Sequence, residues 1–390
     1  MLNIGIDIAS KKHDCCIMNE KGTVLAPVFT FENNAEGFDI LLKNIRTFCR
    51  DFSQAKVGLE STGHYGSNLI SFLKAQGFEI TVFNPLQVDL YRKAGTLRKT
   101  KTDKADAKFI AQMLLTTENS TRADISPLIV ELKALVRHRS RIKAMRTKLR
   151  VSVTRLVSIL FPELPTVVGK VHQASTYALL LELPCAKDIA DCHLTRLSNL
   201  LAESSKKRLG KERALEIKSL ASKSIGLNSR AVGFELQQNI RLIQSVCSEV
   251  DILEKEIKAL MLKINSPILT IPGISYNLGS VILSEIGNIE NFASPSKLLA
   301  FAGLEPSTHQ SGNYYGSNAS MVKRGSPHLR WAILQAARLI AQNDPTFKAY
   351  ARKKEGEGKH FFVVLNHTGK KLLRVMFHML KNNQEFIAAA

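Results

Sequence analysis

A chain of 390 residues is long for one compact domain, and its length favours two or three. Its 54 lysines and arginines outnumber 34 acidic residues, and the net charge of +20 indicates a polyanionic partner. No long apolar run, signal peptide or CxxC pair accompanies the six cysteines, so the sequence argues against a membrane protein, structural zinc and a disulfide scaffold. It predicts a nucleic-acid-binding protein of a reducing cytoplasm.

The first ten residues predict a β-strand. Leu2, Ile4, Ile6 and Ile8 alternate as the core face of a strand does, which turns Asp7 to the opposite side. An ionised carboxylate in the middle of a sheet must be paired, hydrogen-bonded or bound to a cation. Asp7 is therefore the first candidate site residue.

Alternating strand and helix patterns follow. Further strands are expected at 14–18, 23–31, 55–59 and 79–83, with helices near 38–45 and 65–75. The fourth strand delivers Glu60 at its carboxyl end. These elements predict a mixed α/β layer and a first domain over residues 1–119.

A helix is expected to open at Thr102. Asp103 and Asp106 then lie three residues apart on one face of its first turn, where they can share a ligand. The flanking segment is basic, and its candidate phosphate contacts are Arg98, Lys99, Lys101 and Lys104.

A helical middle region is expected over residues 120–265. Apolar residues recur in a four-three rhythm over 128–160 and again over 243–264, which predicts two long helices that pack on each other or on a second subunit. The first helix is strongly basic, and Arg139 and Arg146 are candidates to hold RNA or DNA phosphates. Residues 161–232 between the two helices are helical and polar and match no motif.

A mostly helical third domain is expected over residues 266–390. Residues 268–274, followed by an apolar helix, are typical of a helix-hairpin-helix, in which the turn at Gly273 can present backbone N–H groups to a phosphate. Lys323, Arg324 and Arg330 are further candidates for backbone contacts, and a solvated basic face is the alternative for each of them.

Each carboxylate has a plain structural explanation when taken singly. Asp7 could pair with Lys11, Glu60 could cap the next turn, and acids are common in the first turn of a helix such as that of Asp103 and Asp106. Together, however, they form the arrangement of ribonuclease-H-like nucleases, in which carboxylates bind two Mg²⁺ ions for phosphodiester chemistry. An actin-like ATPase fold would need a second phosphate loop and a glycine-rich adenine motif, and neither is found.

Seven motifs follow one another along the chain: Gly5-Ile-Asp7, Glu60-Ser-Thr-Gly63, Lys101-Thr-Asp-Lys-Ala-Asp106, Ile271-Pro-Gly273, Ala302-Gly-Leu-Glu-Pro306, Gln310-Ser-Gly312 and Lys323-Arg-Gly325. In this order they resemble the DEDD transposases of the insertion sequence one-hundred-and-ten family and its eleven-eleven branch, over nearly the whole chain.

The resemblance implies a RuvC-like domain that holds Mg²⁺, or Mn²⁺, through Asp7, Glu60, Asp103 and Asp106. It implies a coiled coil, and a C-terminal transposase domain with a nucleophilic serine at the position of Ser311. It also implies a structured bridge RNA that pairs with donor and target DNA, dimers that assemble to tetramers, and a Holliday-junction intermediate. Taken alone, a serine before a glycine is usually a turn residue.

We therefore expect a bacterial recombinase that moves its own element, acting in the cytoplasm at the nucleoid through a 5′-phosphoserine bond. A Mg²⁺-dependent junction-resolving nuclease without a covalent intermediate is the first alternative. A basic nucleic-acid-binding scaffold with structural carboxylates is the second.

Overall fold

The structure is a computed structural model that describes residues 1–61, 63, 65–95, 102–116, 125–307, 310–311, 314–315 and 321–388. The chain divides into two compact units, Met1–Ile125 and Ser126–Ala390. Each unit is described by itself.

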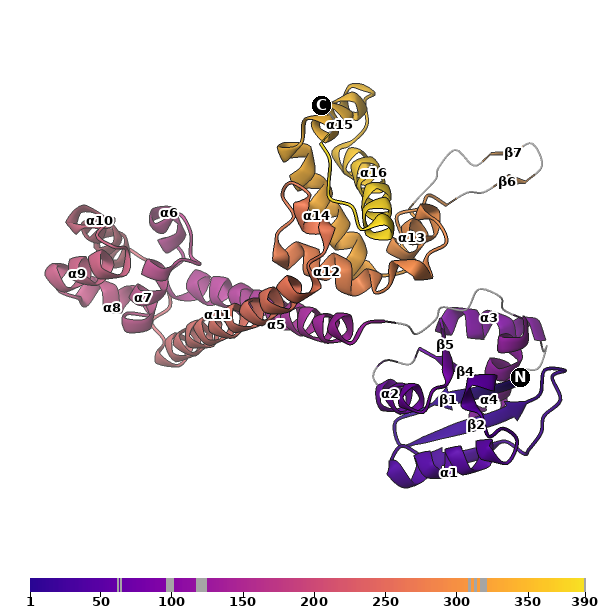
Figure 1. Ribbon diagram of the computed structural model, residues 1–390. Coiled ribbons are helices and arrows are strands. Elements are labelled where there is room, and N and C mark those ends of the chain that lie inside the picture. The colour runs from indigo at the N-terminus through magenta and orange to yellow at the C-terminus, as the bar shows by residue number, and fades with distance from the viewer. Residues whose placement is uncertain are drawn as a thin grey trace. The chain divides into compact units, whose positions relative to one another are not determined.

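The first unit is built on a five-stranded mixed sheet (Figure 1). Its strands are β1 (Leu2–Ile8), β2 (Lys12–Met18), β3 (Phe29–Glu32), β4 (Ala55–Glu60) and β5 (Glu79–Phe83), in the order β3-β2-β1-β4-β5. β2 pairs antiparallel with both β1 and β3, whereas β4 and β5 run parallel to β1. The predicted mixed α/β layer is confirmed.

Helices cover both faces of this sheet. The helical elements are α1 (Ala35–Arg46), η1 (Phe52–Gln54), α2 (Ser67–Ala75), α3 (Pro85–Gly95) and α4 (Asp103–Thr116). The alternating face with Ile4 and Ile6 packs on α1 and α2, and the opposite face with Cys16 and Met18 packs on α4.

The expected strand at 23–31 is wrong at its start, because β3 begins only at Phe29. Before it, Val24 makes a single bridge with Met18. Pro27 lies between Val24 and the start of β3 at Phe29, and proline lacks the N–H that pairing in a sheet needs.

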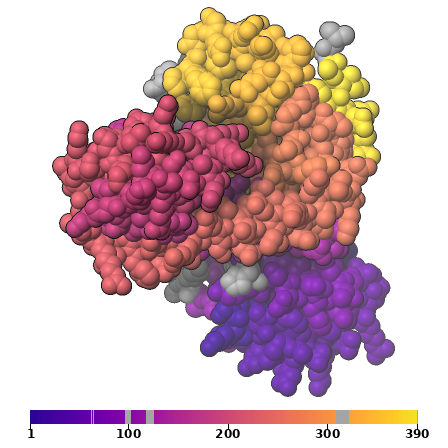
Figure 2. Space-filling model, turned by 90° about the vertical axis from the view of Figure 1, so that its left-hand side faces the viewer, coloured from indigo at the N-terminus to yellow at the C-terminus, as the bar shows by residue number. Residues whose placement is uncertain are grey.

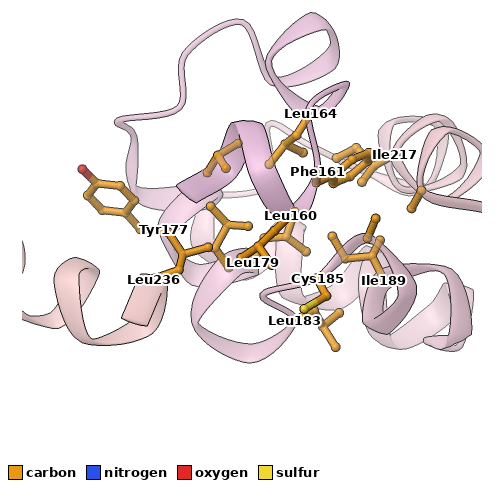
Figure 3. Packing of buried hydrophobic residues seen from close by; sticks show 14 of the residues in the cluster. Leu160, Phe161, Leu164, Tyr177, Leu179, Leu183, Cys185, Ile189, Ile217 and Leu236 are labelled. Carbon is orange, nitrogen blue, oxygen red and sulfur yellow. The ribbon is translucent and has the colours of Figure 1, made fainter. Parts of the chain in front are cut away.

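Two long helices of the second unit pack side by side, α5 (Pro127–Leu160) and α11 (Arg230–Ile264) (Figure 1). Five short helices connect them: α6 (Leu164–Val168), α7 (Ala174–Glu182), α8 (Ala186–Asp191), α9 (Leu194–Ser204) and α10 (Lys211–Ser222). Residues 161–229, here called the distal lobe, share an apolar core with the adjoining ends of α5 and α11, and Phe161, Leu179 and Ile217 belong to it (Figure 3).

The remainder of the second unit is mostly helical. Its elements are η2 (Pro267–Thr270), α12 (Tyr276–Ile286), η3 (Ile289–Asn291), α13 (Pro295–Ala302), β6 (Gln310–Ser311), β7 (Tyr314–Tyr315), α14 (Pro327–Asn343), α15 (Pro345–Gly356) and α16 (Phe361–Asn382). None of the helices in the described part of the chain is long and apolar enough to span a membrane.

Candidate functional site

The register of the sheet brings three acidic residues together. Ile6 of β1 pairs with Leu59 of the parallel strand β4, so the next residue of each strand sets Glu60 beside Asp7. On the other side of β1, Asp7 lies opposite Asp14 of β2. All three side chains belong to the sheet face that α4 covers.

Gly5 allows α4 to approach this face closely. A Cβ atom at Gly5 would lie 2.2 Å from the carbonyl oxygen of Ala107 and 2.3 Å from the backbone nitrogen of Ala111. Glycine is required where two backbones come this near. The contact fixes the height of α4 above β1, and the first turn of α4 carries Asp103 and Asp106.

The electrostatics of Asp7 show that the carboxylates converge. Its pKa is raised from 3.8 to about 6, first by burial and then by the negative charges of Asp106, Asp103, Glu60 and Asp14. Among the described residues, no lysine or arginine forms an ion pair with Asp7. The fold thus gathers Glu60, Asp103 and Asp106 around the partly buried carboxylate of Asp7.

Two members of this cluster were not predicted from the sequence. Asp14 is buried and accepts a hydrogen bond of 2.5 Å from the Thr30 hydroxyl. Arg92 of α3 places its Nη1 3.4 Å from Oδ1 of Asp106 and also pairs with Asp89. Antiparallel pairing of the first two strands would have pointed to Asp14, whereas no sequence signal links Arg92 to Asp106.

The donor set suits a hard divalent cation. Carboxylate oxygens are the ligands that Mg²⁺ and Mn²⁺ prefer, and a cation would relieve the repulsion that raises the pKa of Asp7. Within the described ranges, however, no group of three His, Cys, Asp or Glu side chains is already arranged as a set of metal ligands. The residues therefore fit a metal by chemistry and charge, and their role as ligands stays a prediction.

Ser311 lies in a short hairpin of the second unit. Its backbone in β6 pairs with Tyr314 of β7, and the side chains of both strands lie outside the described part of the structure. The base of the segment is closed by hydrogen bonds from Val322 N to Glu305 O (2.9 Å) and from Ser326 N to Phe301 O (2.8 Å). The ends of the segment that carries Ser311 are thus held together.

A buried carboxylate anchors this base. Glu285 of α12 is 3% exposed and accepts hydrogen bonds from Arg137 Nε (2.9 Å), Arg137 Nη2 (3.1 Å) and Ser326 Oγ (2.7 Å). Burial alone would raise the pKa of Glu285, but the hydrogen bond from Arg137, the charge of Lys133 and the Ser326 hydroxyl together hold it below its usual value. This network joins α5, α12 and the start of α14.

The predicted basic contacts divide into accessible and internal residues. Lys104, Lys323 and Arg324 are exposed, whereas Arg98, Lys99 and Lys101 lie outside the described residues. Arg330 donates hydrogen bonds to the carbonyls of Lys323 (3.0 Å) and Ala302 (3.4 Å), so part of its guanidinium serves the loop base.

The expectation for Arg139 is corrected by its burial. Arg139 is 5% exposed, donates hydrogen bonds to Asn277 and lies 3.6 Å from Glu254. Its guanidinium therefore links α5 to α12 and α11 and does not face solvent. Arg146 is partly buried, with Nη1 3.8 Å from Cys247 Sγ.

Gly273 has a packing role that the sequence did not show. Its φ of +88° belongs to a turn closed by a 3.0 Å hydrogen bond from Ile274 N to Ile271 O. A Cβ at this position would lie 2.8 Å from Cβ of Leu339 in α14. Glycine is needed here for backbone shape and close packing, whether or not the turn also contacts a phosphate.

Comparison with known proteins identifies the family. A transposase family model that carries the DEDD motif and is named for IS110 matches residues 4–162. A second model, described as the transposase IS116/IS110/IS902 family, matches residues 265–352. This chain belongs to the IS110 family of transposases. Membership assigns the protein to DNA transposition and recombination.

Relatives of this IS110-family transposase match it along nearly its whole length. The pilin gene-inverting protein of Moraxella bovis is 24% identical over 384 residues, covering 98% of this chain and 97% of that protein. An insertion element IS116 protein of 44.8 kDa from Streptomyces clavuligerus is 22% identical over 400 residues, covering 99% and 96%. The family predicted from the motifs is confirmed.

Proposed function

We propose that this transposase cuts and rejoins DNA through a covalent bond to Ser311, assisted by divalent cations that Asp7, Glu60, Asp103 and Asp106 hold. The observation that carries the proposal is the convergence of these acids on Asp7, whose pKa is raised to about 6. A cluster of like charges without a cation to neutralise it is costly, and such perturbed groups concentrate at functional sites. The strand order and the helix packed on β1 support a RuvC-like fold for this unit.

The chemistry assigned to the cations is electrostatic. Two Mg²⁺ ions, or Mn²⁺ ions, would steady the charge on the phosphate and on the attacking and leaving oxygens. The protein side chains hold and orient these charges. Arg92, which reaches Asp106, adds a fixed positive group at the same edge of the sheet.

Each bond that Ser311 forms to DNA replaces one phosphodiester bond. Ser311 Oγ loses its proton, forms a bond to the phosphorus atom and displaces the 3′ oxygen, which leaves as a 3′ hydroxyl after taking up a proton. The DNA 5′ phosphate is then an ester of Ser311. Attack by the 3′ hydroxyl of the new strand reverses the step and releases the serine, so the phosphodiester bond energy is kept without a nucleotide cofactor.

The partners proposed are donor DNA, target DNA and a structured bridge RNA. The net charge of +20 suits three polyanions. Phosphate contacts are assigned to Arg98, Lys99, Lys101, Lys104, Lys323 and Arg324. We further propose a division into residues 1–119, 120–265 and 266–390, with α5 and α11 as a coiled coil through which dimers and tetramers form, in the bacterial cytoplasm at the nucleoid.

The test is a search for the protein–DNA adduct. Full-length protein is incubated with donor DNA, target DNA, Mg²⁺ and RNA co-purified from its host, and the products are separated on a denaturing gel. We expect an adduct with wild-type protein and with the control Ser307→Ala, and none with Ser311→Ala or Asp7→Asn. Cleavage by Ser311→Ala at the wild-type level would indicate a hydrolytic nuclease instead. Unchanged DNA processing by Asp7→Asn would make the carboxylates structural.

A further inference from the structure

The distal lobe contains a cavity that the proposed chemistry does not use. The two family models match residues 4–162 and 265–352, so nearly all of the lobe lies between the two matches. The cavity has a volume of about 400 Å³ and is lined by three segments of the lobe. These are the end of α6, the start of α7, and the connection from α9 into α10. Figure 2 looks onto this lobe.

The lining of the cavity is positively charged. Lys206, Arg208 and Arg213 contribute to it, and no acidic residue is among its lining residues. One of the three, Arg213, also pairs with Glu216 at 2.7 Å on the exposed side of α10. The other two are exposed. The net charge of the lining therefore favours an anion.

The first turn of α7 adds donors at the same place. Gln173 precedes the helix but does not cap it, because its side-chain nitrogen donates instead to the carbonyl of Val168 (3.1 Å) and to Thr176 Oγ1 (3.2 Å). The leading amides of α7 are thus left without a side-chain cap. A helix of nine residues carries a partial positive charge at this end.

Ser175 points independently to a ligand. Ser175 lines the cavity, and the residue as a whole is 7% exposed. Within the described part of the chain this hydroxyl has no hydrogen-bond partner, although the neighbouring Ser204 and Ser205 both bond to backbone carbonyls. A bound acceptor would supply the hydrogen bond that this hydroxyl lacks.

We propose that this cavity binds a backbone phosphate of a polynucleotide strand. Phosphate oxygens accept from hydroxyl, amide, lysine and arginine donors alike, and these are the donors that Ser175, the start of α7, Lys206 and Arg208 present. No aromatic side chain lines the cavity, so the contact does not include base stacking. The lobe would therefore add a sequence-independent contact to RNA or DNA, made by residues other than those assigned to chemistry.

The choice of a polynucleotide as the ligand rests on the proposed function. The test measures binding alone and does not depend on catalysis. The protein carries Ser311→Ala throughout, so strand chemistry is off in every sample. The pocket variant is Lys206→Ala with Arg208→Ala. The matched control is Lys187→Ala with Lys223→Ala, which removes the same charge from exposed lysines of the lobe outside the cavity lining. Ser175→Ala is a third variant that changes no charge.

Affinity is measured by fluorescence anisotropy over a range of salt, with labelled oligouridylate and with a DNA duplex of mixed sequence. We expect the pocket variant to lose about threefold to tenfold in affinity for one or both probes, and its slope of log affinity against log salt to fall by about one phosphate contact. Ser175→Ala should weaken the same probe by a smaller factor, and the control pair should change little. A loss of affinity for the RNA probe alone, for the DNA probe alone or for both shows which nucleic acid the cavity contacts.

Inorganic phosphate supplies a second readout. It should raise the melting temperature of the parent protein more than that of the pocket variant, at equal ionic strength in chloride. Equal losses of affinity in the pocket and control variants would overturn the proposal, because only net charge would then matter. Protection by phosphate with no loss of affinity for either nucleic acid would also overturn it, since the cavity would then take a small anion.

Discussion

Replacing Asp7 by asparagine should stabilise the metal-free protein at neutral and alkaline pH. Its pKa rises from 3.8 to about 6 on folding, chiefly because of burial and then because of Asp106, Asp103, Glu60 and Asp14. At about 1.4 kcal/mol per pKa unit, this shift corresponds to roughly 3 kcal/mol of cost for the ionised form. A carboxyl with a raised folded pKa binds its proton more tightly when folded, so the cost is complete above pH 6 and absent below about 3.8.

The assay is thermal unfolding of the full chain in a chelator at several pH values. For a unit of this size we expect Asp7→Asn to melt roughly 5–10 °C above wild type at pH 8, with the difference closing as the pH falls from about 6 towards 4. Mg²⁺ should raise the melting temperature of wild type and have much less effect on Asp7→Asn. The control Asp39→Asn removes an exposed acid on α1 and should show neither effect.

The reasoning would be refuted by a variant that is destabilised equally at pH 8 and pH 5. That result would mean that a partner satisfies the Asp7 carboxylate and that the surrounding acids do not strain it. A stabilised Asp7→Asn that still binds Mg²⁺ as wild type does would refute only the role of Asp7 as a ligand.

Two further predictions concern packing and the loop base. Gly5→Ala should cost about 1–3 kcal/mol, because its methyl group would lie 2.2 Å from Ala107 O, and it should reduce the stabilisation by Mg²⁺ as α4 shifts. Urea unfolding measures this, with Gly356→Ala as the control because its methyl meets nothing within 4 Å; equal costs would contradict the close approach. Glu285→Gln should cost about 2–4 kcal/mol at pH 7 by weakening its bonds to Arg137 and Ser326. Because the folded pKa of Glu285 is lowered, wild type loses this advantage as the pH falls below 4.5, and a difference in melting temperature that stays constant down to pH 3 would be evidence against the network.

The sequence predicted most elements of the first unit from local periodicity. Alternation placed β1, β4 and β5 close to their observed bounds, and the first turn of α4 carries both predicted aspartates. Helix α3 and the short length of β3 were missed. The apolar pattern is weak around Pro27 and over residues 85–95, so periodicity did not predict the structure of either segment.

Long-range pairing explains what the sequence could not show about the site. Arg139 occupies an apolar slot of a basic helix, and only the position of Asn277, far along the chain, shows that its guanidinium is buried. Arg92 meets Asp106, and Arg137 meets Glu285, for the same reason. No local pattern encodes such partners.

The sequence by itself determined the family, most of the strands and helices, and the four acidic residues. Motifs and apolar periodicity depend only on residues that are close together along the chain. The tertiary structure alone decided that these acids converge on Asp7, that Asp14 and Arg92 join them, and that Arg139 is internal. Those outcomes depend on which element packs against which, and close contacts such as Gly5 against α4 set that packing.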